Sequence, residues 1–583
     1  MKRLFATILI LVLTMSLLAA CGQNDGAPAA PPGAPPGAPA GTPTPATQDP
    51  AAPAAQDGET EETPEGPPAP GTPLRGGTLI TGFHVVDAQL VAINPFLPLQ
   101  TAFQVLDLMY ERLLFFNYVT GELMPMLATG YEWSADFMQL TFTIRDGVTW
   151  HDGQPFTAED VVFTFEALRD NPVLDRFALW NVINSVSASG NNVVVNLDTP
   201  FLSFPFYMHE VRIVPAHIWS NVPDVVTELN ERPIGTGPFI WRSHTVGTDV
   251  QFDANPNYWG GAPYVDELLF LTFSTAPALS LAMLNNDMHT SFGLAMPMIP
   301  EFRTIPGATI QIMSGLNMWA VNVNHEDPLL SDPIVRRAMA MAINQNDLIH
   351  RVEHSVVFPT SPGFLPMVFG DLVCQTAFNS LDFDPAGAVE LLESAGFERG
   401  TDGVFATPDG RRLSFTYHNA SGAPAQQMAA GMIQQWLLNI GIEILPRLAT
   451  WPELTRMLET GEFQLLQNQI VVPPDPFAAL NSVFHSSMTA PTGTTTPGLN
   501  YFRYRNPVVD ALLDEAAIST DEARRRAIFF EIQNIIAEDA VFLPMYNTGP
   551  RHFFFDGPFL GGFADDVPIL SNFGIIQIHW VQQ

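Results

Sequence analysis

The chain has 583 residues, with 60 acidic against 25 basic side chains and a formal net charge of −35 at pH 7. This acidic balance argues against nucleic acid as a partner, because phosphate binding needs clustered basic side chains. Lys2 is the only lysine, so a phosphate-loop lysine, a Schiff-base lysine and a serine–lysine dyad are excluded from the folded region.

An export signal is predicted over residues 1–20. Lys2-Arg3 makes the start positive, and residues 4–18 form an apolar run that is too short to span a membrane. Small residues then lead to Cys21, and the ending Leu-Ala-Ala-Cys resembles the lipobox of bacterial lipoproteins. The resemblance implies that Cys21 is acylated and becomes the first residue of the mature protein, which anchors the chain to a membrane.

Residues 21–74 are expected to form a disordered tether that starts at the lipidated cysteine. Between residues 22 and 73 there is no large aliphatic or aromatic side chain, and proline, alanine, glycine, threonine and acidic residues fill the interval. Such a segment has nothing to bury, and its proline content keeps it extended. We therefore expect a folded body at the outer face of the cytoplasmic membrane, on the cell surface or in the periplasm.

The sequence contains no motif of metal-dependent or nucleophilic catalysis. Once Cys21 is lipidated, Cys374 stands alone, so no intramolecular disulfide forms and we interpret Cys374 as a small core residue. There is no Gly-x-Ser-x-Gly elbow and no His-Glu-x-x-His pair. The sequence therefore predicts no metal, no cofactor and no enzymatic activity.

The roughly 510 residues after the tether are too many for one core and predict two or three domains. Gly76-Gly77 opens a strand, residues 101–115 carry a helical apolar pattern, and residues 138–145 alternate as a half-buried strand does. Thr157 is placed to cap a helix whose first turn is acidic. Further elements are predicted as a strand at 318–323 and helices at 335–343, 386–395, 425–440 and 524–537.

Several stretches contain sequence motifs that are typical of one protein family. Residues 125–162 contain Pro-Met-Leu-Ala, Tyr-Glu-Trp-Ser, Trp-His-Asp-Gly and Thr-Ala-Glu-Asp-Val-Val, and residues 255–266 contain Asn-Pro-Asn-Tyr-Trp-Gly and Tyr-Val-Asp. Asn324 follows a strand and precedes a helix that starts Asp-x-x-Val-Arg. From residue 76 to about 546, the chain resembles the extracellular solute-binding proteins of family 5, the peptide-type receptors of ABC importers.

The resemblance implies an α/β fold with two lobes, of the periplasmic-binding-protein type (type II, cluster C), and an extra subdomain in the first lobe. It places the first lobe in residues 75–115, 225–315 and 547–583, the extra subdomain in 116–224 and the second lobe in 316–546. Closure of the lobes would enclose a solute. An ABC permease and its ATPase subunits would receive that solute from a monomeric protein.

The second lobe departs from the pattern of the peptide binders in this family. Those proteins often carry Ala-Asp-Tyr-x-Asp-Pro, whose first aspartate pairs with the terminal amine of the ligand. Here Asp475-Pro476 matches the second half, while Val472 stands where the amine-binding aspartate is expected. Either Asp475 replaces that aspartate or the ligand lacks a free amine at this place, because an unpaired buried ammonium costs several kcal/mol. Alternatively, Asp475 only begins a turn before the proline.

Aromatic and amide side chains supply the remaining candidate ligand contacts. Aromatic rings offer apolar area with little entropy loss, although each is also a candidate for core packing. Amides bond peptide groups and sugar hydroxyls alike, so peptides are the leading solute and oligosaccharides, which the Val472 departure favours, are the first rival. A surface enzyme on wall or glycan substrates and a solute sensor are two further hypotheses. The candidate residues are Tyr110, Trp319, Asn322, Trp451, Gln467, Asn468, Gln469 and Asp475.

Overall fold

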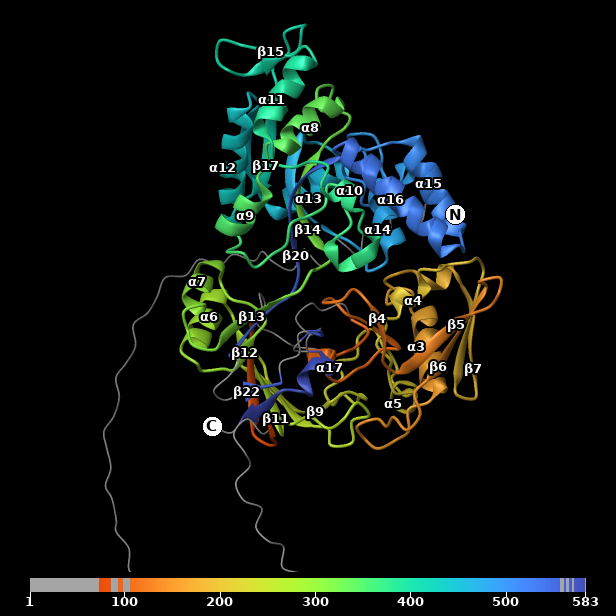
Figure 1. Ribbon diagram of the computed structural model, residues 1–583. Helices are drawn as coiled ribbons and strands as arrows, with labels where there is room; N and C mark the ends of the chain where they lie inside the picture. The colour runs from red at the N-terminus through yellow and green to blue at the C-terminus, as the bar shows by residue number, and fades with distance from the viewer. Residues whose placement is uncertain are drawn as a thin grey trace, which may run out of the picture.

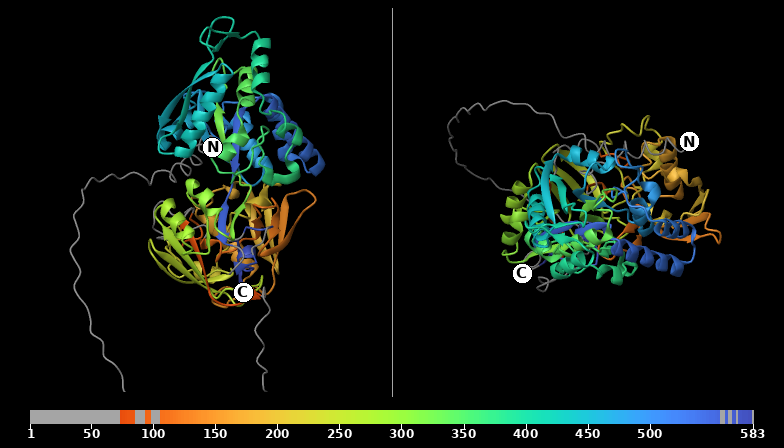
Figure 2. Two further views of the ribbon diagram at one scale, coloured as in Figure 1. Left: turned by 60° about the vertical axis from the view of Figure 1, so that its left-hand side comes forward. Right: turned by 90° about the horizontal axis from the view of Figure 1, so that it is seen from above.

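The computed structural model describes residues 73–84, 93–97, 105–555, 560–562, 566–568 and 571–581. These residues form two lobes, which lie one above the other in Figure 1 and in the left view of Figure 2. The predicted export signal, Cys21 and nearly all of the tether lie outside the described residues. Within the described ranges, no helix has both the length and the hydropathy that a membrane span requires.

Lobe 1, the lower lobe in Figure 1, is built on a seven-stranded sheet with the order β13-β21-β12-β2-β11-β10-β9. The central strands β12, β2 and β11 run parallel, and the outer strands pair antiparallel. Helices α6 and α7 pack on one face through Leu279, Met283 and Phe302. The bounds are β2 (Thr78–His84), β9 (Phe239–Thr245), β10 (Asp249–Ala254), β11 (Glu267–Phe273), β12 (Thr290–Ser291), β13 (Ala308–Ile312), β21 (Arg551–Phe555), α6 (Ala276–Leu284) and α7 (Ile299–Phe302).

The last described segment of the chain completes lobe 1. Strand β23 (His579–Val581) pairs antiparallel with both β1 (Pro73–Leu74) and β22 (Leu560–Gly561). Helix α17 (Asn572–Ile575) precedes β23, and its Asn572 amide donates to the buried carboxylate of Glu111 at 3.3 Å. Both ends of the folded region therefore belong to this lobe.

An extra subdomain, at the right of lobe 1 in Figure 1, carries a four-stranded antiparallel sheet with the order β5-β6-β8-β7. Its β6 confirms the predicted alternating strand, and Thr157 with Asp160 forms a capping box at the start of α3, as predicted. A separate hairpin, β3–β4, precedes this sheet. The bounds are β3 (Leu114–Phe116), β4 (Leu123–Pro125), β5 (Ala128–Trp133), β6 (Gln139–Ile144), β7 (Ile183–Ser189), β8 (Asn192–Leu197), α3 (Ala158–Asp170), α4 (Phe204–Tyr207), α5 (Ala216–Trp219) and η1 (Leu179–Asn181).

The helix predicted over residues 101–115 is wrong in its second half. The chain is helical at 105–106, turns over 107–110 and enters β3 at Leu114, while 101–104 lie outside the described residues. The apolar pattern arises because this turn is buried on all sides. Its carbonyls bond across the chain instead of along a helix, since Gly237 N–H donates to Met109 at 2.8 Å. A Cβ on Gly237 would lie 2.3 Å from the carbonyl oxygen of Leu108, so this approach requires glycine.

Lobe 2 is built on a five-stranded sheet with the order β18-β17-β19-β14-β20. Strands β18, β17 and β19 run parallel, and β14 lies antiparallel to both β19 and β20. The strand predicted at 318–323 is confirmed as β14. The bounds are β14 (Asn317–Val323), β17 (Ser414–Ala420), β18 (Glu443–Ala449), β19 (Leu465–Val471) and β20 (Phe542–Thr548).

Helices cover both faces of the lobe 2 sheet and confirm the four predicted helices. Helices α8, α9, α11 and α12 pack on one face, and α14, α15 and α16 on the other, with α13 beside them. Gly441, in the left-handed region at φ 85°, follows α12 as predicted. The bounds are α8 (Pro333–Met341), α9 (Gln345–Arg351), η3 (Met367–Leu372), α10 (Gln375–Phe378), α11 (Pro385–Ser394), β15 (Glu398–Arg399), β16 (Phe405–Ala406), α12 (Pro424–Asn439), α13 (Trp451–Thr460), α14 (Pro476–Phe484), η4 (Ser486–Met488), α15 (Pro507–Ile518) and α16 (Glu522–Glu538).

Two short crossovers join the lobes within the described residues, at 313–316 and 549–550. Gly315 and Gly549 meet there, and a Cβ on Gly549 would lie 2.1 Å from the carbonyl oxygen of Met313 and 2.3 Å from the Gly315 nitrogen. The Asn547 amide donates to the carbonyl of Gly315 at 2.9 Å. The crossovers therefore touch backbone to backbone, which only glycine permits at this spacing.

Substitution of Gly549 by alanine should push the crossovers apart. We expect Gly549→Ala to lower the free energy of unfolding by about 1–3 kcal/mol, as overpacking does, and to change the radius of gyration in small-angle scattering. Gly431→Ala, inside α12 with no atom within 4 Å of its added Cβ, is the matched control. It should keep or raise stability. Equal behaviour of the two variants in urea unfolding would contradict the contact.

Candidate functional site

One edge of the lobe 2 sheet faces lobe 1. Strand β14 starts at Asn317, directly after the first crossover, and its partner β19 ends opposite it at Val471. Strands β17 and β18 run parallel to β19, so their carboxyl ends lie at the same edge. Ligands of open α/β sheets bind outside such carboxyl ends. We call this the interlobe edge, formed by the strand ends and by residues 421–423, 450–451 and 472–475.

Asp475 is engaged in protein contacts at this edge. It is the N-cap of α14, where its carboxylate accepts hydrogen bonds from the N–H groups of Phe477 and Ala478, each at 3.3 Å. It also accepts a hydrogen bond from the hydroxyl of Ser203, which belongs to the extra subdomain. Both side chains are 2% exposed. Asp475 therefore links lobe 2 to the subdomain of lobe 1, which the sequence did not predict.

Two further carboxylates at or beside the interlobe edge are also engaged. Glu353 accepts from the Arg551 guanidinium of lobe 1 at 3.2 Å. Glu453 accepts from the backbone N–H and the hydroxyl of Thr450, both at 2.8 Å, in a capping box at the start of α13. Each carboxylate thus has a structural partner in the present conformation.

Val472 stands where an amine-binding aspartate is expected, and the side chains packed around it are apolar. It is 3% exposed and packs in the cluster that contains Ile470 and Phe364. Its N–H donates to the carbonyl of Leu316 at 2.9 Å. The described side chains of this cluster carry no carboxylate that would pair with an ammonium group.

The three predicted aromatic residues lie in different environments. Tyr110 has no exposed surface in the core of lobe 1, where its hydroxyl accepts from the Asn230 amide at 2.8 Å and burial raises its pKa. This placement favours the core-packing interpretation. Trp319 in β14 is 8% exposed and packs under the helices of lobe 2. Trp451, at the start of α13 on the interlobe edge, is 40% exposed and is available to a ligand.

The predicted amides also divide into buried and half-buried positions. Asn322 has no exposed surface, and its amide donates to the Leu466 carbonyl at 3.2 Å. Gln467 is 2% exposed and accepts from the Tyr417 hydroxyl at 3.0 Å. Asn468 and Gln469 are half-buried, and Gln469 donates to the Thr548 hydroxyl at 3.2 Å beside the second crossover. The structure thus brings Gln469, Trp319 and Trp451 toward the interlobe edge, whereas Asn322 points into the interior.

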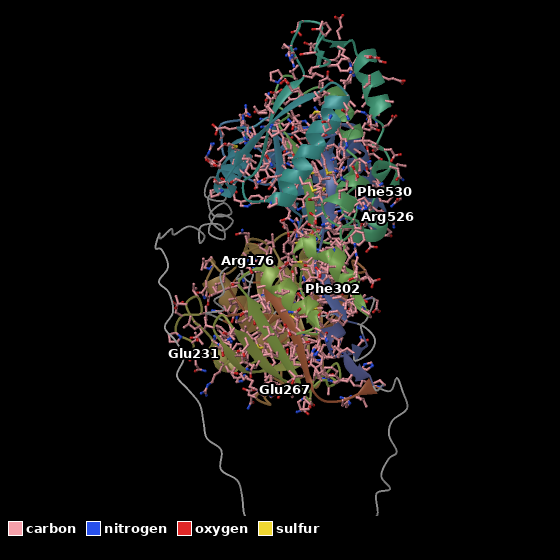
Figure 3. The ribbon with its side chains drawn as sticks, turned by 90° about the vertical axis from the view of Figure 1, so that its left-hand side faces the viewer. Arg176, Glu231, Glu267, Phe302, Arg526 and Phe530 are labelled. Atoms are coloured by element: carbon pink, nitrogen blue, oxygen red, sulfur yellow. The ribbon has the colours of Figure 1, made fainter. Side chains whose placement is uncertain are left out.

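Further contacts between the lobes were missed by the sequence analysis. The β3–β4 turn presses on lobe 2, because a Cβ on Gly121 would lie 1.7 Å from the carbonyl oxygen of Val368. On the other side, Arg303 donates to the carbonyl of His354 at 2.7 Å. Arg303 is next to Phe302 in the sequence. Figure 3 labels Phe302 in lobe 1 and Arg526 above it in lobe 2. A turn signal marked Gly121 in the sequence, but its partner is 247 positions away and left no local signal.

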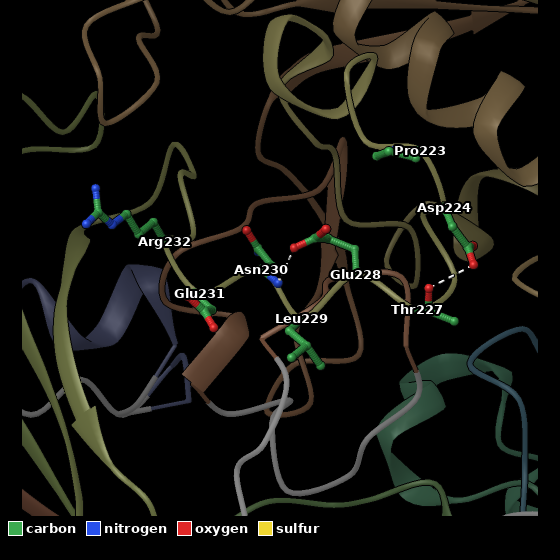
Figure 4. Close-up of a pocket in the computed structure, with 8 residues that line it drawn as sticks. All are labelled: Pro223, Asp224, Thr227, Glu228, Leu229, Asn230, Glu231 and Arg232. Atoms are coloured by element: carbon green, nitrogen blue, oxygen red, sulfur yellow. Dashed lines mark hydrogen bonds between the residues drawn. The ribbon is translucent and has the colours of Figure 1, made fainter.

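Two cavities lie outside the interlobe edge. One of about 650 Å³ is lined by residues 223–232 of lobe 1, where Asn230 N–H bonds Glu228 at 2.8 Å (Figure 4). Another, of about 520 Å³, lies at the opposite end of lobe 2 and is lined by residues that include Asn324, Asp327, His418 and Glu462. In the part of the chain that the structure describes, no three His, Cys, Asp or Glu side chains are grouped to hold a metal ion.

Residues from the two stretches that resemble the family, 125–162 and 255–266, lie close to one another in lobe 1, away from the interlobe edge. The Glu111 carboxylate is fully buried and accepts from Tyr258 and Trp259, both at 2.8 Å, and burial raises its pKa. The Arg145 guanidinium stacks 4.0 Å from the ring centroid of Trp259. His151 contacts the carbonyl of Gly237 at 3.0 Å. These residues hold lobe 1 together.

Comparison with known families identifies the chain. The family model described as bacterial extracellular solute-binding proteins, family 5 Middle, matches residues 122–490. The chain belongs to this family. The match starts in the extra subdomain and runs through most of lobe 2.

Relatives of this solute-binding protein include a putative ABC transporter peptide-binding protein of Brucella ovis, 28% identical over 482 residues that cover 79% of this chain and 85% of the relative. The oligopeptide-binding protein AppA of Bacillus subtilis is 25% identical over 69% of this chain and 74% of its own length. A solved periplasmic oligopeptide-binding protein of Thermotoga maritima matches with a TM-score of 0.74 and 23% identity, over 86% of this chain and 99% of that one. This structural similarity confirms the two-lobed fold.

Removal of the Ser203 hydroxyl should weaken the contact between the subdomain and lobe 2. We expect Ser203→Ala in the solute-binding protein to lower the free energy of unfolding by about 1–3 kcal/mol, because it leaves one buried carboxylate oxygen with fewer partners. Ser187→Ala, on exposed β7 of the same subdomain, should change it by less than about 0.5 kcal/mol. Equal urea midpoints for the two variants would show that the bond contributes nothing.

The pH dependence of stability should carry a contribution from Asp475. Burial raises its pKa, although the Ser203 bond acts in the opposite direction. An acid with a raised folded-state pKa favours the folded state at low pH, and this contribution is lost as the pH rises through that pKa. Relative to wild type, Asp475→Asn should therefore gain stability between pH 4 and pH 7. The free energy of unfolding of both proteins is measured by urea titration at each pH. If the difference between variant and wild type does not change with pH, or changes in the opposite direction, this assignment is refuted.

Proposed function

We propose that this protein is a lipid-anchored receptor outside the cytoplasmic membrane that binds oligopeptides or dipeptides and delivers them to an ABC import permease. The observation that carries the proposal is the family match together with two lobes joined by two crossovers. A bound solute stabilises the closed arrangement of such lobes by its higher affinity for that state. The permease would then distinguish loaded from empty receptors.

Peptides are the preferred solute because of what the similar proteins bind. The solved AppA structure of Bacillus subtilis is a complex with a nonapeptide, and a Helicobacter pylori binding protein, DppA, is a complex with the peptide STSA. Trp451 and Gln469 would contact the peptide at the interlobe edge, with Trp319 behind them. The lipid anchor is proposed on Cys21, at the end of the predicted export signal.

An oligosaccharide is the second candidate, on one specific observation. Val472 is buried among apolar side chains, and Asp475 is bonded to Ser203, so the interlobe edge shows no carboxylate free to pair with a peptide amine in the described part of the chain. The Thermotoga maritima protein with the same fold has also been solved with mannohexaose. Enzymatic turnover and a sensing role are less favoured, since the family consists of solute-binding proteins.

Native mass spectrometry of residues 75–583, purified gently, tests the proposed solute. We expect a mixed set of peptide masses in stoichiometric complex with the protein. A ladder of hexose masses would replace the peptide assignment with the oligosaccharide one. If the protein emerges empty, titration with defined peptides and with mannohexaose decides, and failure of both to bind would refute the receptor proposal.

The anchor has its own test. We expect full-length protein expressed in a bacterium to incorporate a labelled fatty acid and to partition into detergent, because acyl chains on one cysteine bury many methylene groups. The Cys21→Ala variant should lose both properties. Label that persists in the variant would contradict the assignment of Cys21.

A further inference from the structure

Several side chains of lobe 2 carry buried polar atoms without a hydrogen-bond partner, and two of them lie side by side on neighbouring strands. They are the Asn419 side-chain oxygen in β17 and the Gln467 side-chain nitrogen in β19. Each residue is only 2% exposed. An unpaired buried polar atom is unfavourable, so a pair of them in one region indicates a missing partner.

The two unpaired atoms belong to the same face of the sheet. Tyr417 pairs with Leu465 in the register of β17 and β19, and Asn419 and Gln467 each lie two residues further along. Side chains two residues apart share a face, so both residues lie on the face of Tyr417. The Tyr417 hydroxyl donates to the Gln467 side-chain oxygen at 3.0 Å, and the nitrogen of the same amide has no partner to which it donates.

The pair lies next to the interlobe edge. Asn419 is the penultimate residue of β17, and the next same-face residue of β19 after Gln467 is Gln469, which pairs with Trp319. Tyr546 of β20 also pairs with Trp319 and extends the same row of polar and aromatic side chains. The row therefore ends at the interlobe edge, at the end of β19 and the start of β14.

The surroundings of the pair are apolar or neutral. At the carboxyl ends of β18 and β19, Leu448 is 61% and Val471 60% exposed, and Trp451 is 40% exposed. The nearby carboxylates of Glu353 and Asp475 are already bonded to Arg551 and Ser203. A positively charged group would thus find neither of these two carboxylates free, whereas a neutral group with a donor and an acceptor would satisfy both unpaired atoms.

We propose that Asn419 and Gln467 form a neutral subsite that receives an uncharged hydrogen-bonding group of the solute, a carboxamide or a hydroxyl. Asn419 accepts from that group and Gln467 donates to it, while Trp451 and Val471 cover the adjacent apolar part of the solute. The subsite rests on the receptor function proposed above and specifies its ligand chemistry. A glutamine or asparagine side chain of a peptide and a sugar hydroxyl both supply such a group.

Calorimetric titration of the full folded chain separates these sources. The probes are the pentapeptide Ala-Ala-Gln-Ala-Ala, its variants with central leucine or lysine, and mannohexaose. If the group is a peptide carboxamide, the glutamine peptide should bind at least tenfold more tightly than the other two peptides. If it is a sugar hydroxyl, mannohexaose should bind and the peptides should not.

Asn419→Leu keeps the side-chain shape and removes the unpaired acceptor. It should weaken the preferred probe at least tenfold and leave the melting temperature of the empty protein unchanged or higher. Thr489→Val is the matched control, because Thr489 also buries an unpaired hydroxyl in lobe 2 but lies beyond η4, away from the interlobe edge. It should leave the affinity unchanged.

The outcomes distinguish failure of the subsite from failure of the receptor function. If a probe binds and Asn419→Leu binds it equally well, the subsite is refuted and the receptor function stands. If all three peptides bind with equal affinity, the proposed selectivity is refuted in the same way. If neither peptides nor mannohexaose bind wild-type protein, both the receptor function and the subsite are refuted.

Discussion

The contact between Gly315 and Gly549 sets the geometry of the whole molecule. The two crossovers that join the lobes touch each other at atom-to-atom spacings that exclude any side chain. The two connections between the lobes therefore lie side by side at one place in the molecule. The Glu353–Arg551 pair lies beside this contact, whereas the Ser203–Asp475 bond joins the lobes far from it in the chain.

Much of the fold was predictable because its signals are local or concern the interior of one lobe. Strand β6, the capping box at Thr157 and the left-handed Gly441 follow from residues within a few positions of each other. The stretch at 255–266 that resembles the family also serves the packing of lobe 1, because Tyr258 and Trp259 donate to the buried carboxylate of Glu111. A substitution of either residue would leave a buried polar group with fewer partners.

The candidate site was less predictable, because its properties depend on partners that are remote in the chain. Asp475 before a proline predicts a helix start equally well whether or not a ligand pairs with it, and only the fold brings Ser203 to its carboxylate, 272 positions away. The core position of Tyr110 has the same kind of cause, because the amide that donates to its hydroxyl belongs to Asn230, 120 positions away. The helix predicted to reach 115 stops early because a distant glycine loop bonds its carbonyls.

The division of the chain between lobes has a consequence for the order of folding. Residues 317–548 form lobe 2 as one continuous segment, whereas lobe 1 needs β21 and α17 from the far side of lobe 2. Contacts between residues this distant in sequence form slowly, because a long loop must close first. During synthesis, lobe 2 is therefore able to fold before Asn572 is available to bond Glu111 in the core of lobe 1. The intermediate with a folded lobe 2 and an incomplete lobe 1 exposes apolar surface, and is therefore the state most susceptible to aggregation and proteolysis.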